Sequence, residues 1–486
     1  MSTFDDIRNE RIKKLEALRA SGVNPYPIHS SRTISCEDFT SKFGELQDSG
    51  KIETVAGRVM SLRGQGGIMF VDIFDGTGKA QVVFQESEMN ADLFTLFSTT
   101  VDKGDFLEIE GAAFTTKRGA PSLKASSWRM LSKSLRPIPD EWYGLKDEEL
   151  RLREREIAIL LDADLRAIFI RKSAFWRAVR SFLESRDFIE VETPVLETSP
   201  GGADARPFLT HHNALDIDAY LRISAGELWQ KRLLVAGFPK VFEIGRIFRN
   251  EGQSSEHVQD YTQCEWYEAY SDYEKGMVMV RDLYRFIAST VYGREKFTIR
   301  GHEVDLSIDW PKIHFGEEIK KQFGIDPFYC TEEEAILSAK KGGVELESGA
   351  NKARAVDQMW KSIRKTIAGP AFLVGVPVFL EPLAKRSEKN PDEVERFQVI
   401  LAGSEMGKGF SELNNPLDQR TRFEEQEILR AGGDLEAQRL DESYLNAMEY
   451  GMPPAFGFGV SERLFAFFED KSAHETQLFP LLRPKE

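Results

Sequence analysis

The segment LAGSEMGKGFSELNNP places a lysine among glycines, as phosphate-binding loops do. A P-loop, however, needs four residues between its glycines and a Ser or Thr directly after the lysine. Here three residues separate Gly403 from Gly407, and a glycine follows Lys408. The segment is therefore not a P-loop, and its two carboxylates, Glu405 and Glu412, indicate another kind of site.

Charged and aromatic side chains recur with the period of a β-strand here and in YTQCEWYEAY. Residues two apart in a strand share one face of a sheet. The two sets are Lys408, Phe410 and Glu412, and Tyr261, Glu265 and Tyr267. Arg249 ends the strand before the second set. Each set can line a cleft for a charged ligand or be a polar sheet face in water, and alone neither interpretation is favoured.

The second half of the chain predicts the sheet that must position these sets. KVFEIGRIFRN and YTQCEWYEAY are expected to be strands around the polar loop EGQSSEHVQD, and FIEVETPVL a strand ending at Pro194. PAFLVGVPV and RFQVILAG add two strands, and FGFGVSERLFAFFED is a strand that turns into a helix. Helices interspersed with hairpins indicate a mostly antiparallel sheet, because a hairpin cannot join parallel neighbours.

The first part of the chain predicts a separate all-β domain. Residues 53–134 contain about five short apolar or alternating runs separated by turns, a spacing typical of a small barrel or sandwich. The OB-fold is the five-stranded barrel candidate. Residues 1–52 are expected to form a charged helix and lead-in, 135–156 a linker, and 157–486 the mixed domain. The predicted fold class is α+β, with an OB-fold barrel before an antiparallel-sheet domain.

Composition narrows the class of protein. A chain of 486 residues is too long for one core, and 41% hydrophobic residues is ordinary for a globular protein. The longest apolar runs, such as AFLVGVPVFL, are too short for a membrane span. Three cysteines form neither a disulfide framework nor a CxxC pair, which favours a reduced, cytoplasmic protein. The net charge of −15 argues weakly against a general nucleic-acid coat protein.

Several segments together resemble one enzyme family. FIEVETPVL, FRNEGQSSEHVQDYTQCEWYEAY and FGFGVSERLFAF resemble motifs 1, 2 and 3 of class II aminoacyl-tRNA synthetases. GGADARPFLTHHNALDIDAYLRIS, GFSELNNPLDQRTRF and LFPLLRPK narrow the resemblance to the lysyl-tRNA synthetases, and it covers essentially the whole chain. The segment from about 312 to 365 matches the insertion between motifs 2 and 3. Motif 1 builds a homodimer interface in this class, so the resemblance implies a dimer.

The resemblance implies that this protein binds ATP, L-lysine and tRNA(Lys). Arg249 would bridge the lysine carboxylate and the α-phosphate, a role suited to a planar bidentate donor. Glu251 would contact adenine, with Tyr261 on one of its faces and Arg463 on the other. His257 would reach toward the outer phosphates. Because a carboxylate attacks without a general base, catalysis would consist of positioning and charge stabilisation.

The same segment of motif 3 has a simpler interpretation beside the catalytic one. Gly457 and Gly459 would let the backbone approach a nucleotide closely. Ser461 is well placed to cap the helix that follows. Without motif 2 upstream, an ordinary helix start would be the preferred interpretation.

The implied amino-acid pocket is rich in acids. By resemblance, Glu412 and Tyr267 take the side-chain ammonium of lysine, whereas Glu227 and Gly202 take the α-amino group. The remaining members of the implied set are Arg249, Glu265, Lys408 and Phe410. A buried ammonium without a partner is very costly, so a cationic substrate needs such acids. An aspartate-specific relative would need a cation where Glu412 lies.

Two residues depart from the family pattern. Gln398 stands where a metal-binding Glu is usual, seven residues before Glu405, so the implied Mg²⁺ site of Glu405 and Gln398 loses a charge. Lys408 replaces an Asn near the substrate carboxylate. Beside the substrate ammonium, Lys408 would weaken binding, because two like charges about 4 Å apart repel by roughly 4 kcal/mol at an effective dielectric of about 20. We therefore predict that Lys408 faces the carboxylate or a phosphate, with Glu412 at the far end of the pocket.

The barrel matches the family's anticodon-binding domain. Arg63, Phe70 and Gln81 fall where relatives contact the central anticodon uridine, with a ring to stack on the base and polar groups for its edge. A buried core position is the alternative for Phe70. Two other functions stay open: a paralogue that lysylates a protein or makes dinucleotides, and a non-catalytic RNA-binding relic. The barrel argues against the first, and the retained site residues argue against the second.

Overall fold

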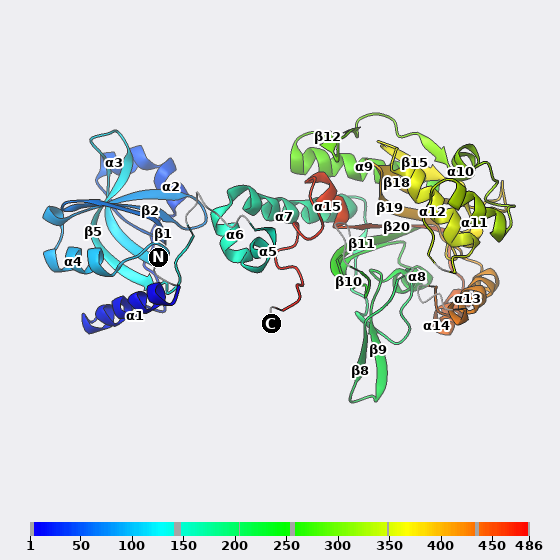
Figure 1. Cartoon of the computed structure of the whole chain (residues 1–486), viewed down its shortest axis with the longest axis horizontal. Coiled ribbons are helices and arrows are strands. Elements are labelled where there is room, and N and C mark those ends of the chain that lie inside the picture. Colours follow the sequence, from blue (N-terminus) through cyan, green and yellow to red (C-terminus); the bar gives the residue numbers. More distant parts are fainter. Residues whose placement is uncertain are drawn as a thin grey trace. The chain divides into compact units, whose positions relative to one another are not determined.

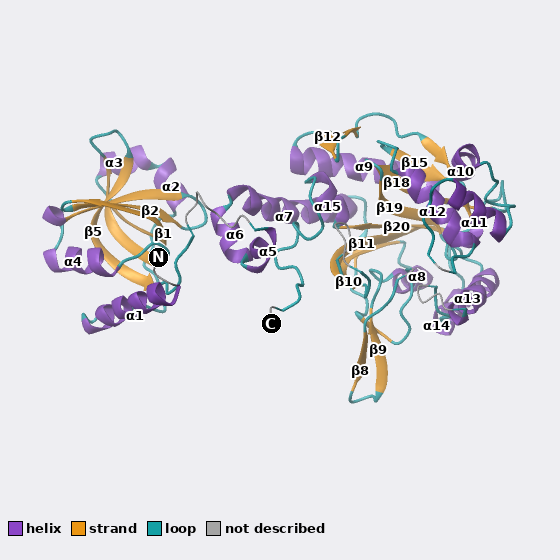
Figure 2. Cartoon of the chain, viewed as in Figure 1, coloured by secondary structure: helices purple, strands orange, loops and turns teal. Residues whose placement is uncertain are grey.

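The structure is a computed structural model that describes residues 4–139, 147–203, 205–252, 258–347, 349–432 and 437–484. Its contacts divide the chain into two compact units, Met1–Asp147 and Glu148–Glu486. The first combines a barrel of strands with helices, and the second mixes helices with a central sheet (Figure 2). Each unit has its own core.

A closed five-stranded barrel forms the first unit (Figure 1). The strands pair in the order β1-β2-β3-β5-β4. They are β1 (Ile52–Gln65), β2 (Ile68–Phe74), β3 (Lys79–Gln85), β4 (Phe106–Thr115) and β5 (Pro121–Ser132). The helices are α1 (Phe4–Ala20), α2 (Cys36–Ser41), α3 (Phe43–Ser49) and α4 (Ala91–Thr100). Alternate residues such as Val71 and Ile73 are fully buried, as a period of two requires. The predicted five-stranded barrel is confirmed.

An eight-stranded sheet forms the centre of the second unit, in the order β14-β15-β18-β19-β20-β11-β10-β6. Neighbours are antiparallel except at the edges, where β14 pairs parallel with β15 and β6 with β10. The strands are β6 (Ile189–Glu190), β10 (Lys240–Phe248), β11 (Asp260–Ala269), β14 (Lys312–His314), β15 (Ala371–Val374), β18 (Arg396–Leu401), β19 (Ser404–Ser411) and β20 (Ala455–Ser461). The prediction of a mostly antiparallel sheet is confirmed.

Smaller sheets and helices surround this sheet. The small sheets contain β7 (Leu196–Glu197), β8 (Leu209–His212), β9 (Ile217–Leu221), β12 (Lys296–Ile299), β13 (His302–Asp305), β16 (Val376–Pro377) and β17 (Glu393–Val394). The helices are α5 (Glu148–Arg153), α6 (Arg155–Leu161), α7 (Ala163–Glu184), α8 (Glu227–Val235), α9 (Tyr273–Ile287), α10 (Phe315–Phe323), α11 (Glu332–Lys341), α12 (Lys352–Arg364), α13 (Pro416–Ala431), α14 (Glu442–Glu449) and α15 (Arg463–Phe468).

The alternating side chains of β20 distinguish a packed face of the sheet from an open face. Phe456 and Phe458 point to the packed face, where the rings of Phe458 and Trp266 lie 4.7 Å apart. Helix α9 packs closely here because Gly276 has no side chain, and a Cβ there would overlap the ring of Phe456. The alternate residues of β20 are glycines on the opposite face. That face is left open for a ligand.

The segment FIEVETPVL forms a shorter strand than predicted, since β6 has only two residues. Beyond it, the Thr193 backbone N–H and hydroxyl both donate to the Glu243 carboxylate, at 3.0 and 2.6 Å. These side-chain bonds replace the ladder bonds that would have continued the strand.

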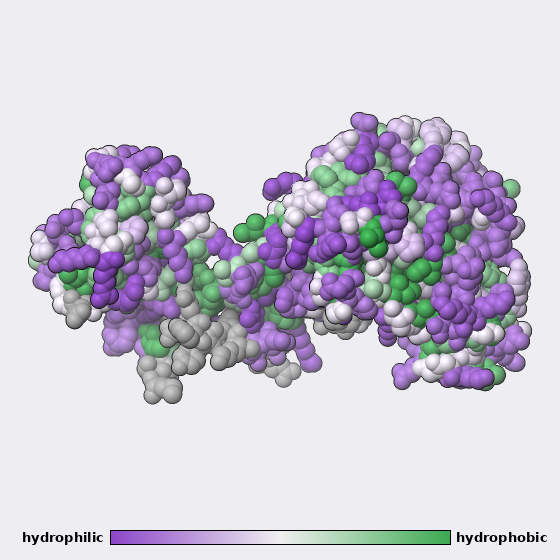
Figure 3. Space-filling view, turned by 90° about the horizontal axis from the view of Figure 1, so that it is seen from above, coloured by the Kyte–Doolittle hydropathy of each residue, from purple (hydrophilic) through white to green (hydrophobic). Residues whose placement is uncertain are grey.

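The described helices do not include one that is both long enough and apolar enough to cross a membrane. On the face shown in Figure 3, hydrophilic residues predominate and hydrophobic ones appear in scattered groups.

Candidate active site

The open face of the sheet is the floor of a cavity of about 520 Å³. Strands β11, β18, β19 and β20 form this floor, and residues of α8 and α12 add to the walls. The predicted site residues that line it are Gly202, Glu227, Arg249, Glu251, Tyr261, Glu265, Tyr267, Gln398, Glu405, Lys408, Phe410, Gly457, Gly459 and Arg463. His257 lies outside the described residues. The structure thus gathers residues that are far apart in the sequence around one cavity.

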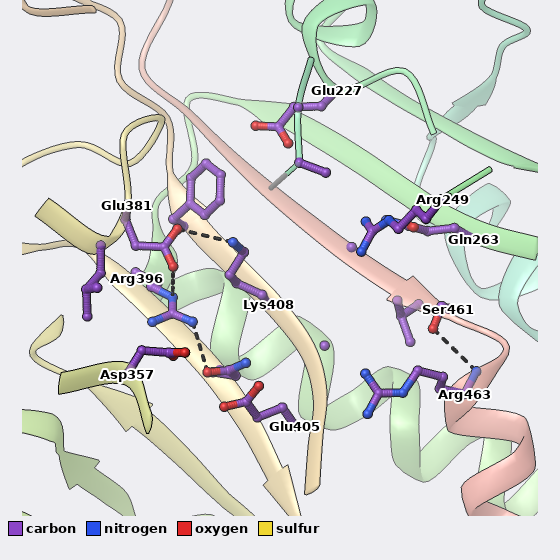
Figure 4. A pocket seen from close by; sticks show the side chains of 18 of the residues that line it. Glu227, Arg249, Gln263, Asp357, Glu381, Arg396, Glu405, Lys408, Ser461 and Arg463 are labelled. Atoms are coloured by element: carbon purple, nitrogen blue, oxygen red, sulfur yellow. Dashed lines mark hydrogen bonds and ion pairs between the residues drawn. The ribbon is translucent and has the colours of Figure 1, made fainter. Parts of the chain in front are cut away.

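The two predicted catalytic arginines, Arg249 and Arg463, lie on the same side of the cavity (Figure 4). The Arg249 guanidinium is 5.8 Å from the centre of the Tyr261 ring, and its Nε donates to Ile223 O at 3.2 Å. Burial raises the pKa of Tyr261, and the charges of both arginines oppose that rise. An aromatic ring and two guanidinium groups at one side of a cavity suit a planar, negatively charged ligand such as a nucleotide.

Strand β20 turns into α15 beside these arginines. The Ser461 hydroxyl accepts a hydrogen bond from Arg463 N at 3.3 Å, at the first residue of the helix. Of the two glycines before it, Gly457 leaves no room for a side chain and Gly459 leaves little. A Cβ on Gly457 would overlap Glu412 Oε1 and the Tyr267 ring, and one on Gly459 would lie 3.3 Å from Gln263 Nε2.

The buried carboxylate of Glu265 has three hydrogen-bond donors around it. Ala225 N and Gln263 Nε2 donate to Oε1 at 2.9 and 2.6 Å, and the Tyr267 hydroxyl donates to Oε2 at 3.1 Å. Burial raises the pKa of Glu265 to about 7, as does the nearby charge of Glu227. The pKa of Glu265 therefore lies close to neutral pH.

A buried lysine, Lys231, bridges the two other acids of the predicted pocket. Its Nζ lies 2.7 Å from Glu227 Oε1 and 2.5 Å from Glu412 Oε2. Burial lowers the pKa of Lys231, but the charges of Glu227 and Glu412 outweigh burial and raise it, so the ammonium stays protonated. Burial raises the pKa of Glu412 to about 8, although Lys231 opposes the shift. Glu412 lies behind the cavity wall, next to Gly457.

Gly202 lies beside Glu227, as the predicted pairing requires. Its φ is +85°, and a Cβ would overlap Glu227 Cβ and Ser224 Oγ, so only glycine fits. Its backbone N–H donates to Gln438 Oε1 at 3.3 Å. An α-amino group can therefore meet the Glu227 carboxylate next to exposed backbone.

On the other wall, Glu381 connects the basic residues of β18 and β19 (Figure 4). Its Oε1 lies 3.0 Å from Arg396 Nε, and its Oε2 lies 3.2 Å from Lys408 Nζ. Arg396 Nη2 also donates to Gln398 Oε1 at 2.9 Å. Lys408 and Gln398 are partners across the two strands. Lys408 therefore lines the cavity with part of its charge balanced by Glu381.

The two predicted metal ligands are already in contact with the protein. Glu405 Oε1 accepts a hydrogen bond from Trp360 Nε1 at 3.1 Å and lies 3.4 Å from Arg364 Nε, and Gln398 Oε1 is engaged by Arg396. In the described ranges, no group of three or more His, Cys, Asp or Glu side chains could hold a metal ion. Mg²⁺ commonly takes one or two carboxylates together with substrate phosphates. Glu405 fits as one such carboxylate, and the Gln398 oxygen, which already accepts from Arg396, keeps a second lone pair for a metal ion.

The three predicted anticodon residues share one face of the barrel. Arg63 and Phe70 are partners across β1 and β2, and Asp72 and Gln81 are partners across β2 and β3. Arg63 Nη2 lies 3.2 Å from Asp72 Oδ2, and Gln81 Oε1 accepts from the Ser122 hydroxyl. Phe70 is half-buried and not a fully buried core residue, so its ring has an accessible face.

Sequence reasoning missed several residues of the site. Lys231 follows Glu227 by four positions, the spacing of an ordinary surface ion pair on a helix, and nothing in the sequence places it in a core. Glu381 lies in a short connection with no periodic pattern. Helix α12 contributes Asp357 and Trp360 to the cavity wall, and it lies in the segment that matches the insertion between motifs 2 and 3.

Comparison with known proteins agrees with this geometry. Residues 147–483 match the family model described as tRNA synthetases class II (D, K and N), and residues 53–131 match the OB-fold nucleic acid binding domain. The chain belongs to the class II tRNA synthetases of this D, K and N family. It is 40% identical to a lysine–tRNA ligase of Moorella thermoacetica, over 99% of each chain. Proteins of the same name from Roseiflexus castenholzii and Thermotoga maritima are 39% and 37% identical, over 99% of this chain and 100% and 97% of theirs.

Proposed function

We propose that this protein joins L-lysine to tRNA(Lys), with ATP as the energy source and lysyl-adenylate as the intermediate. The observation that carries the proposal is the distribution of charge around one cavity, with arginines on one side and three buried carboxylates at the other end. Lysine has one carboxylate for the arginines and two ammonium groups for the acids. An aspartate or asparagine substrate has no side-chain ammonium for these acids.

The first step forms lysyl-adenylate. An oxygen of the lysine carboxylate attacks the α-phosphorus of ATP, the bond from this phosphorus to the bridging oxygen breaks, and pyrophosphate leaves. The attacking group is already ionised, so no base is needed, and the protein contributes position and charge. Arg249 bridges the carboxylate and the α-phosphate, while Tyr261 and Arg463 hold the two faces of adenine and Glu251 its edge. In the second step a terminal hydroxyl of the tRNA attacks the carbonyl carbon of lysyl-adenylate, and AMP leaves.

Magnesium enters this proposal as the companion of ATP. Bound Mg²⁺ neutralises charge on the phosphates. Glu405 would supply its protein carboxylate, and the Gln398 amide oxygen, which accepts from Arg396, would add an uncharged oxygen nearby. We also propose a homodimer, on the resemblance of FIEVETPVL to motif 1, and a cytoplasmic location, on the three free cysteines. Light scattering from the purified protein measures the oligomeric state.

Amino-acid-dependent ATP–pyrophosphate exchange tests the proposed function. With each of the twenty amino acids in turn, we expect exchange with lysine and not with aspartate or asparagine. Charging of tRNA(Lys) with radioactive lysine must follow. No exchange with any amino acid would support the RNA-binding relic, and exchange without tRNA charging would support the paralogue.

Replacing Phe70 with alanine is expected to raise the KM for tRNA(Lys) about tenfold. Stacking of a base on an aromatic ring contributes roughly 1–3 kcal/mol, and Phe70 is the half-buried ring of the predicted anticodon face. Lysine-dependent exchange, which uses no tRNA, should be unchanged. The matched control is Phe106→Ala. Phe106 is also a half-buried ring of the barrel, but it contacts Arg58, which is not a predicted anticodon residue. Equal losses in both variants would show a general effect on the barrel.

Replacing Lys408 with asparagine is expected to lower kcat/KM in the exchange reaction about tenfold. Lys408 is held by Glu381 at the cavity wall, from which its charge can act on a phosphate or on the lysine carboxylate. Lys312→Asn is the control, since Lys312 forms a similar half-exposed pair with Glu274 outside the cavity lining. A sharply lower KM for lysine with an unchanged rate would place Lys408 beside the substrate ammonium and refute this role.

A further inference from the structure

Lys231 is a charged side chain at the closed end of the cavity. It lies on the buried face of α8, and 1% of its surface is exposed. Burying a charge is costly unless it is paired, and Lys231 is paired twice, with Glu227 Oε1 and Glu412 Oε2. Its Nζ also lies 5.4 and 5.8 Å from the ring centres of Phe410 and Tyr267. The ammonium therefore fills the space where the two carboxylates and two rings meet.

The cavity ends in front of this ammonium. Tyr267, Phe410 and Gly457 line the cavity, whereas Lys231 and Glu412 lie behind them with about 1% of their surface exposed. Neither oxygen of Glu412 has a hydrogen-bond partner in the part of the chain that the structure describes, and Oε2 is the one in an ion pair with Lys231. Oε1 lies 2.2 Å from the position that a Cβ on Gly457 would take. Because Gly457 lines the cavity and has no side chain, this oxygen lies next to the cavity. One unpaired, buried oxygen thus points to a ligand cation.

The net charge of the ionised side chains at the closed end of the cavity also matches a diamino acid. Glu227, Glu265 and Glu412 contribute three carboxylates when ionised, and Lys231 contributes one ammonium, which leaves two negative charges. A diamino acid carries two ammonium groups, one at each end of its chain. The recess is therefore neutralised by one such molecule and not by an amino acid with an uncharged side chain.

We propose that Lys231 determines the length of the cationic side chain that this site accepts. Because its ammonium fills the space behind Phe410 and Tyr267 and pairs with Glu412 Oε2, an incoming side chain must stop at Glu412 Oε1. A longer cation would have to displace a buried, doubly paired lysine. This inference rests on the proposed function, since it concerns the pocket for the amino acid.

Exchange with L-lysine and with L-homolysine, which has one more methylene, tests the inference. The wild-type protein should favour lysine by at least about 100-fold in kcat/KM. Lys231→Ala vacates the deep site between two carboxylates, so the preference should fall at least tenfold, mainly through a lower KM for homolysine. No wild-type exchange with lysine would refute the proposed function, whereas an unchanged preference in the variant would refute only the role of Lys231.

The matched control is Lys133→Ala. Lys133 is equally buried in the barrel and also lies between two carboxylates, 2.6 Å from Asp102 and 2.8 Å from Asp105. Its loss should lower the melting temperature without changing the preference for lysine. A crystal structure of the wild-type protein with lysine covers the case in which Lys231→Ala does not fold. The ligand ammonium should lie at Glu412 Oε1 with Lys231 still on Oε2, and a ligand on Oε2 with Lys231 displaced would overturn the inference.

Discussion

Replacing Arg249 with alanine is expected to lower kcat/KM for lysine-dependent ATP–pyrophosphate exchange by about 1000-fold. Negative charge is shared among the carboxylate, the α-phosphate and the leaving pyrophosphate during the attack. A preorganised donor aimed at such charge contributes a factor of about 10²–10³. Arg249 also positions the two reacting groups, because its guanidinium can bind both. Initial rates over a grid of lysine and ATP concentrations measure the loss.

Two further variants separate the geometry of this side chain from its charge. Arg249→Lys keeps the charge without the planar fork, so it should recover less than tenfold of the lost activity. Arg246→Ala removes another arginine of the same hairpin, paired with Asp260 outside the cavity lining, and should stay within about threefold of the wild type. Activity of Arg249→Ala within tenfold of the wild type would exclude a bridging role for Arg249.

The barrel and the open face of the sheet were predictable because local patterns determine them. Alternating apolar residues place Val71 and Ile73 inside the barrel wherever the strand lies. In the same way the period of two in β11 and β19 places Glu265 with Tyr267, and Lys408 with Phe410, on one face. A strand pattern predicts which side chains face together, and the sheet order then brings them to one cavity.

The ion pairs inside the cavity were not predictable from such patterns. Lys231 meets Glu412 across 181 positions of sequence, and Glu381 meets Lys408 across 27. Nothing local distinguishes these charges from solvated ones on a surface. Thr193 ends β6 through a bond to Glu243, which is also far away in the sequence. Each of these features depends on packing between distant segments, and not on the period of any one element.

Replacing Glu412 with glutamine is expected to raise the KM for lysine about 100-fold and leave the KM for ATP unchanged. The amide keeps the size of the side chain but removes the charge that meets an ammonium. Removing one partner of a buried ion pair costs about 3–5 kcal/mol, because the other charge stays buried, and about 1.4 kcal/mol corresponds to tenfold in affinity. Asp105→Asn is the control, since Asp105 is a buried partner of Lys133 in the barrel. This substitution should lower the stability of the protein and leave the KM values for lysine and ATP unchanged.

The pH dependence of lysine binding gives a second measure of the same role. Burial raises the pKa of Glu412 to about 8 and that of Glu265 to about 7. Below these values the two side chains hold protons that must leave before an ammonium can pair with the carboxylates. The KM for lysine should therefore fall as the pH rises from 6 to 8. In Glu412→Gln the fall between pH 7 and 8 should disappear, and a variant with the wild-type profile and KM would show that Glu412 does not bind the substrate.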